Sequence, residues 1–147
     1  MQLKTVITLA AAIFCIQANA QKDTATANTD TAKKEFITVQ VEAQFPGGAK
    51  GWQKYLEANL NADLGAKYLK PKKGQIITQV AIVSFLVNTN GEISEVELIN
   101  PDDVHKKLGA ETVRVIKEGP RWVPATQNGK KVIYRQKQSV TWQVSGE

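Results

Sequence analysis

The chain has 147 residues, of which 42% are hydrophobic and 22% charged, and its net charge is +5, values typical of a single globular domain. One cysteine excludes an internal disulfide, and one histidine leaves little for histidine-based metal or acid–base chemistry. The composition therefore argues against several large classes of enzyme.

The N-terminus has the pattern of a secretory signal peptide. Lys4 supplies a positive charge, residues 5–16 are mostly apolar, and residues 18–20 form an A-x-A cleavage site. The apolar run of twelve residues is shorter than the ~20 that a spanning helix needs. We predict a signal peptide over residues 1–20, cleavage after Ala20, a periplasmic location and no direct membrane insertion after cleavage.

A disordered leader is predicted over residues 21–35, because this stretch is rich in Thr, Ala, Asn, Asp and Lys and lacks large apolar side chains. The folded domain is predicted over residues 36–147. It opens with a short extended piece at residues 36–39, and the Phe-Pro-Gly-Gly turn at residues 45–48 leads into a helix.

The first predicted helix is amphipathic, since Trp52, Tyr55, Leu56 and Leu60 recur at helical spacing. We expect Trp52 and Tyr55 to pack in the core rather than to stack on a ligand. The basic stretch of residues 61–74 is interrupted by glycine and proline, which predicts an irregular connection.

The strongest predicted strand runs from Gln75 to Asn88 and is apolar on both faces, which indicates a central position in a sheet. One face carries Ala81, Val83, Phe85 and Val87, and the other carries Val80, Ile82 and Leu86. Asn90-Gly91 predicts a hairpin turn. The three-residue step from Ile93 to Val96 in the return strand indicates a bulge.

A second helix is predicted after Asp102 and Asp103, whose carboxylates offer capping oxygens, and Gly119-Pro120 ends it. The last strand is predicted over Lys131–Val144. Its apolar face carries Val132, Tyr134, Val140, Trp142 and Val144.

These elements predict an α+β fold, a small three-stranded antiparallel sheet with two helices packed on one face. An antiparallel last strand has to skip one strand, which places the first long strand in the centre and the last strand at an edge. That edge would present unpaired backbone N–H and C=O groups.

No arrangement of residues in the sequence indicates catalysis, so we predict that the protein is not an enzyme and uses no cofactor. The chain lacks both a G-x-S-x-G motif and a G-x-x-x-x-G-K phosphate loop. The polar residues 102–105 are explained better by helix capping than by a metal site. Interspersed acidic residues and the signal peptide argue against nucleic acid as a partner.

Five motifs in the same order resemble the TonB C-terminal domain family. They are F-P-G-G at 45–48, W-x-x-Y-L-x-x-N-L at 52–60, V-x-F-x-V-N-x-x-G-x-I-x-x-V at 83–96, R-V-I at 114–116 and P-x-W-x-P-A-x-x-N-G-K at 120–130. The resemblance extends over residues 44–144. The family fold, a small antiparallel sheet with two helices on one face, agrees with the predicted topology.

The resemblance implies a binding module in the periplasm. In the family, the domain is the end of an energy transducer, and it grips the TonB box of an outer-membrane receptor by adding that peptide to its edge strand. The implied partner is an outer-membrane TonB-dependent receptor or a similar envelope protein, in connection with transport. Carried over by position, the binding residues are Lys131, Val132, Ile133, Tyr134, Arg135, Gln136, Lys137, Gln138, Ser139 and Val140.

Two features depart from the family pattern, since the sequence shows neither a spanning helix nor a long Pro-rich linker. One alternative is therefore a minimal energy transducer, anchored in the membrane by an uncleaved N-terminal segment. Another is a structural or inhibitory domain that forms a homodimer through the edge strand. The charges of Lys131, Arg135 and Lys137 fit either selection of an acidic or neutral peptide or protection of an open edge from aggregation.

Overall fold

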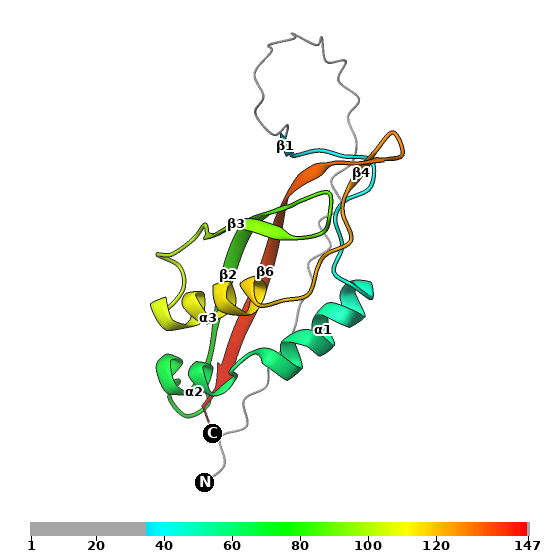
Figure 1. Cartoon of the computed structure of the whole chain (residues 1–147). Coiled ribbons are helices and arrows are strands. Elements are labelled where there is room, and N and C mark those ends of the chain that lie inside the picture. The colour runs from blue at the N-terminus through cyan, green and yellow to red at the C-terminus, as the bar shows by residue number, and fades with distance from the viewer. Residues whose placement is uncertain (1–34, 147) are drawn as a thin grey trace.

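The computed structural model describes residues 35–146 (Figure 1). The predicted signal peptide and the predicted leader up to residue 34 lie outside these residues. The elements in chain order are β1 (Glu35–Phe36), α1 (Gly48–Asn59), α2 (Asp63–Leu69), β2 (Ile76–Val87), β3 (Ile93–Leu98), α3 (Lys106–Lys117), β4 (Thr126–Gln127), β5 (Lys130–Lys131) and β6 (Ile133–Ser145).

The main sheet has four strands in the order β1-β6-β2-β3, and β4 and β5 form a separate two-stranded sheet. The antiparallel β6-β2-β3 core, with β2 in the centre, confirms the predicted α+β class and the predicted strand order. The predicted count of three strands is wrong, because β1 adds in parallel to the start of β6. A two-residue strand has no alternation of its own that a sequence pattern could reveal.

The described chain also has a third helix, α2, where the sequence predicted an irregular connection. Tertiary packing overrides the weak local signal there, since Gly65 and Leu69 are buried and α2 lies against β6. Gly65 allows this close approach, because a Cβ atom at its position would lie 3.2 Å from Val144 Cγ2 and 3.5 Å from Trp142 Cε3.

The N-terminus of α3 differs from the prediction, because His105 caps it rather than Asp102 or Asp103. The Nδ1 atom of His105 accepts a hydrogen bond from the backbone N–H of Lys107 at 3.2 Å. The backbone N–H of His105 donates to Gln79 Oε1 at 2.8 Å, which ties the start of α3 to β2. The cap therefore depends on a contact between elements that are distant in sequence.

The two faces of β2 follow the predicted alternation. Ala81, Val83, Phe85 and Val87 are fully buried on the face that carries the helices. The predicted bulge is also confirmed, since the β2–β3 register shifts between Ser84 and Leu86, and Glu95 has a positive φ of 50°.

Aromatic side chains join α1 to the sheet, which confirms that Trp52 packs in the core. The ring of Phe85 lies 5.0 Å from that of Trp122, and the ring of Phe45 lies 5.5 Å from Trp122 and 5.2 Å from Trp52. The four rings form one continuous cluster between α1, β2 and the loop after α3.

Phe85→Ala should lower the free energy of unfolding by about 3–5 kcal/mol, because Phe85 is fully buried and its loss leaves a cavity between the sheet and this cluster. Denaturant unfolding measures the loss. Val80→Ala is the control, since Val80 lies in the same strand but is 36% exposed on the opposite face, and should cost less than about 1 kcal/mol. Comparable losses for the two variants would contradict the assignment of the faces.

Candidate functional site

The long strand β6 has one fully paired side and one largely open side. On the paired side it is in register with β2 from Tyr134 to Ser145. On the other side β1 pairs only with Ile133 and Tyr134 (Figure 1). Within residues 35–146, no strand lies beside this edge from Arg135 onward.

The hydrogen bonds of β2 show which backbone groups of β6 face the open edge. Ile82 directs both its N–H and its C=O toward the β3 side, to Asn100 Oδ1 and the N–H of Ile99 respectively, each at 2.9 Å. Because these directions alternate along an antiparallel strand, the odd-numbered residues of β2 bond to β6. Their register partners are the even-numbered residues of β6, so the odd-numbered residues of β6 point their N–H and C=O away from β2. Along the uncovered part of the strand these are Lys137, Ser139, Thr141 and Gln143.

The side chain of Gln136 bends onto this edge. Its Nε2 atom donates to the backbone carbonyl of Lys137, an outward-facing acceptor, at 3.3 Å. Its Oε1 atom is buried and has no hydrogen-bond partner among the described residues. A buried acceptor without a donor costs free energy, so this amide is poised to exchange partners when another donor arrives.

The charge of Arg135 is balanced by two carboxylates within the described residues. Arg135 forms ion pairs with Glu35 of β1 and with Glu95 of the β3 bulge, the latter at 2.5 Å between Nη2 and Oε2. The hydrogen bond from Arg135 holds the pKa of Glu35 below its usual range. This arrangement ties β1 to the sheet at the point where the open edge begins.

Four of the predicted binding residues lie off the open edge. Lys131 belongs to β5, and the N–H of Val132 donates to the carbonyl of Ala125 at 3.0 Å. Ile133 and Tyr134 are paired with β1. Tyr134 is buried on the helix side, and burial, together with the negative charge of Glu42, raises its pKa to about 12.

Two further residues outside the predicted set, Thr141 and Gln143, lie on the open edge beyond Val140. Both residues fall within the predicted strand, and extending the alternation to its end would have included them. Among Gln136, Lys137, Gln138, Ser139 and Val140, only Lys137 and Ser139 turn their backbone outward, while the other three bond to β2.

The outward-facing residues of the edge carry amide, hydroxyl and ammonium groups, all of which can form hydrogen bonds. No group of three His, Cys, Asp or Glu side chains within residues 35–146 could hold a metal ion. In the same part of the chain, no helix has the length and apolar character needed to cross a membrane.

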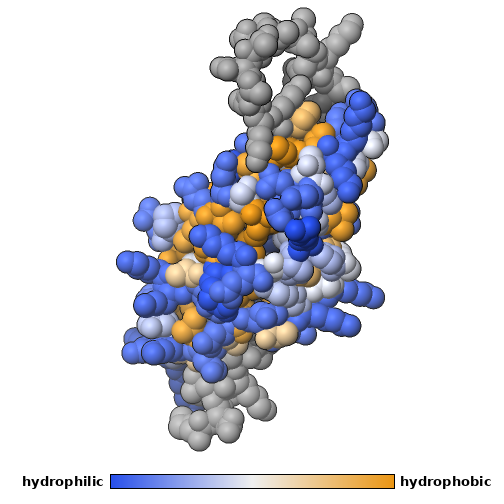
Figure 2. Space-filling model, in the orientation of Figure 1, coloured by the Kyte–Doolittle hydropathy of each residue, from blue (hydrophilic) through white to orange (hydrophobic). Residues whose placement is uncertain are grey.

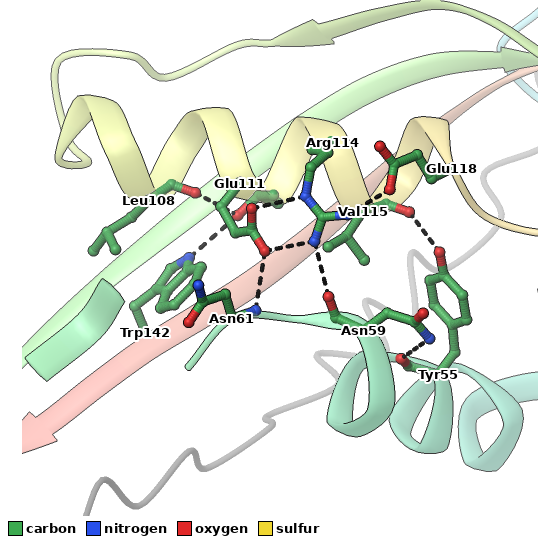
Figure 3. A network of polar contacts seen from close by, with 10 residues as sticks. Tyr55, Asn59, Asn61, Leu108, Glu111, Arg114, Val115, Glu118 and Trp142 are labelled. Carbon is green, nitrogen blue, oxygen red and sulfur yellow. Dashed lines mark hydrogen bonds and ion pairs between the residues drawn. The ribbon is translucent and has the colours of Figure 1, made fainter. Parts of the chain in front are cut away.

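A second polar cluster joins α3 to the end of α1 (Figure 3). Glu111 accepts hydrogen bonds from Arg114 Nη2 at 2.7 Å and from the backbone N–H of Asn61 at 2.9 Å. Arg114 Nη2 also donates to the carbonyl of Asn59 at 2.9 Å, and the Tyr55 hydroxyl donates to the carbonyl of Val115 at 2.9 Å. These hydrogen bonds pair backbone groups at the ends of α1 and α3, the N–H of Asn61, and the side chains of Glu111 and Arg114. We therefore assign the cluster to holding the helices in place against one another.

One family matches the chain, and its description is Gram-negative bacterial TonB protein C-terminal. The match covers residues 73–144, from the connection before β2 almost to the end of β6. Residues 73–144 belong to the TonB C-terminal family. No curated protein and no solved structure matches it.

Membership in the TonB C-terminal family confirms the predicted resemblance and sets the broad function. TonB family proteins act in the cell envelope in connection with transport, and this family is a non-enzymatic protein-interaction domain. The matched TonB segment contains β2, β3, α3 and the whole uncovered part of the β6 edge as far as Val144.

The polar cluster around Arg114 should make the stability of the fold depend on pH. The hydrogen bond from Arg114 lowers the pKa of Glu111, whose side chain is 10% exposed, so this carboxylate stabilises the fold above its unfolded-state pKa. That stabilisation is lost as the pH falls through the lower, folded-state pKa. Glu111→Gln should therefore lower the free energy of unfolding at pH 7 by about 1–3 kcal/mol and weaken its dependence on acidic pH.

Chemical denaturation between neutral and acidic pH measures both effects. Glu118→Gln is the matched control, because Glu118 also pairs with Arg114 but is 60% exposed, and it should change stability by less than about 0.5 kcal/mol. If Glu118→Gln lowers the free energy of unfolding as much as Glu111→Gln, the exposed Arg114–Glu118 ion pair stabilises the fold equally. The larger contribution assigned to Glu111 would then be wrong.

Proposed function

We propose that the protein is a periplasmic binding module in which the open edge of β6 receives an extended peptide from an envelope partner. The peptide adds as a strand beside β6, and the partner is an outer-membrane TonB-dependent receptor presenting a TonB-box type segment. The observation that carries this proposal is the set of outward-facing backbone groups at Lys137, Ser139, Thr141 and Gln143.

The length of the open edge fits a short peptide. Residues 137–143 of β6 extend for roughly 20 Å at about 3.3 Å per residue. Four outward-facing residues offer four donors and four acceptors, enough to fix the register of a peptide of about seven residues. Because β1 occupies the edge at Ile133 and Tyr134, the peptide has to pair downstream of Arg135.

The side chain of Gln136 also supports peptide pairing at the open edge. Its amide nitrogen holds the Lys137 carbonyl at 3.3 Å, which is long for an N–H···O hydrogen bond. A backbone N–H of the peptide replaces this donor with better geometry and releases the Gln136 amide. The released side chain then rotates so that its Oε1 atom gains the donor it lacks.

Charge contributes less to recognition than the backbone. Arg135 is held by Glu35 and Glu95, whereas Lys137 is exposed and makes no ion pair with the described residues. An acidic peptide residue beside Lys137 therefore gains only a surface pair, worth about 0–1 kcal/mol. Affinity depends mainly on main-chain hydrogen bonds.

Two substitutions at one position test this dependence. Ser139→Pro removes an outward-facing N–H without breaking a bond to β2, and proline is tolerated at edge positions of this kind. It should weaken the binding of a receptor N-terminal peptide at least about fivefold, the equivalent of one lost hydrogen bond. Ser139→Ala keeps the N–H and should bind like the wild type in isothermal titration.

Equal affinities for the wild type, Ser139→Ala and Ser139→Pro would show that the peptide does not pair with this edge. Circular dichroism checks that the Ser139→Pro variant is folded. Sedimentation of the free protein tests the alternative function, because dimers that dissociate in Ser139→Pro but persist in Ser139→Ala would assign the edge to self-association.

A further inference from the structure

One end of the molecule carries most of the net positive charge of the described chain. Residues 63–73 and 102–107 contain six lysines and three aspartates, whereas the rest of residues 35–146 contains nine basic and eight acidic side chains. Three of the four net positive charges of the described chain therefore lie at this end. We call it the basic end, and its lysines are Lys67, Lys70, Lys72, Lys73, Lys106 and Lys107.

The fold brings the two segments of the basic end together. The ring of Tyr68 in α2 stacks on the ring of His105 at 4.6 Å, directly before the first turn of α3. Lys67 Nζ lies 5.5 Å from the centre of the Tyr68 ring. The bridge between Lys73 and Gly146 places the last lysine of the first segment beside the end of β6.

The six lysines are exposed, and none of them forms an ion pair within the part of the chain that the structure describes. Hydrophilic side chains project over much of the visible face in Figure 2, including the part where Figure 1 shows α2 and the start of α3. The exposed apolar side chain of Ile76, 62% accessible, follows Lys72 and Lys73 by a few residues. Exposed lysines without ion-pair partners among the described residues, followed in the chain by an exposed aliphatic side chain, match the chemistry of a lipid headgroup region.

We propose that the basic end docks on an anionic lipid surface. The charges are lysines spread over two helices and a connection, without an arginine fork that would hold one phosphate in a fixed geometry. Such a distribution suits many headgroups in a plane. The proposal does not depend on peptide binding, because the open edge of β6 uses different residues.

Vesicle sedimentation with the full chain tests the proposal. Binding is measured to phosphatidylcholine vesicles that contain phosphatidylglycerol and to vesicles of pure phosphatidylcholine. The readout is the first value divided by the second, and this ratio cancels any binding of the N-terminal segment to neutral lipid. The triple variant Lys67→Gln, Lys72→Gln, Lys73→Gln should lower this ratio about a hundredfold, since each lysine near an anionic surface contributes roughly a factor of five.

The matched control is Lys50→Gln, Lys54→Gln, Lys117→Gln, which removes three exposed lysines elsewhere and makes the same change in net charge. It should retain the wild-type ratio within about threefold, and the wild-type ratio should fall at high salt. Equal losses in both variants would show that binding follows net charge and would overturn the proposal. Retention on dextran sulfate that depends on the basic end, without preference for anionic vesicles, would assign the surface to a soluble polyanion and overturn it as well.

Discussion

The antiparallel pairing of β2 with β6 is the constraint on which the rest of the structure depends. It runs without interruption from Ile76 opposite Ser145 to Val87 opposite Tyr134. This register places Phe85, Trp142 and the other buried side chains on one face, under the helices. A slip of one residue would turn every one of these side chains to the opposite face, so the hydrophobic core and the register specify each other.

The same register determines what the open edge can do. With the even-numbered residues of β6 bonded to β2, the odd-numbered residues hold their backbone groups free for another strand. β1 and the Arg135 ion pairs close the first part of the edge, so that a partner has access only to its downstream part. In the proposed function, peptide recognition follows from the core packing and uses backbone groups rather than a specialised side chain.

The sequence predicted the parts of the fold that have a long, regular pattern. β2 and β6 alternate over many residues, and the Asn-Gly turn and the step from Ile93 to Val96 marked the hairpin and its bulge. β1 is too short to have a period, and α2 depends on the approach of Gly65 to Val144, a contact between distant parts of the chain. Local sequence therefore predicted an extended piece near β1, but neither the pairing of β1 with β6 nor the helix α2.

The sequence alone cannot specify which residues of β6 lie on its open edge. The sequence located the edge strand, but which of its residues face outward depends on the pairing with β2, and which of them are covered depends on β1. Lys131 and Val132 were therefore included, although the Asn128-Gly129 turn places them in the β4–β5 hairpin and its exit. Thr141 and Gln143 were left out, although they continue the outward-facing set.

Residue-resolved amide hydrogen exchange, with and without a receptor N-terminal peptide, tests whether the odd-numbered residues of β6 are free to pair with a partner strand. In the free protein, the amides of Lys137, Ser139, Thr141 and Gln143 should exchange much faster than those of Gln138, Val140 and Trp142, which bond to β2. Bound peptide should slow the first group and leave the second unchanged. Slow exchange of both groups in the free protein, or peptide binding that leaves the first group fast, would contradict the account.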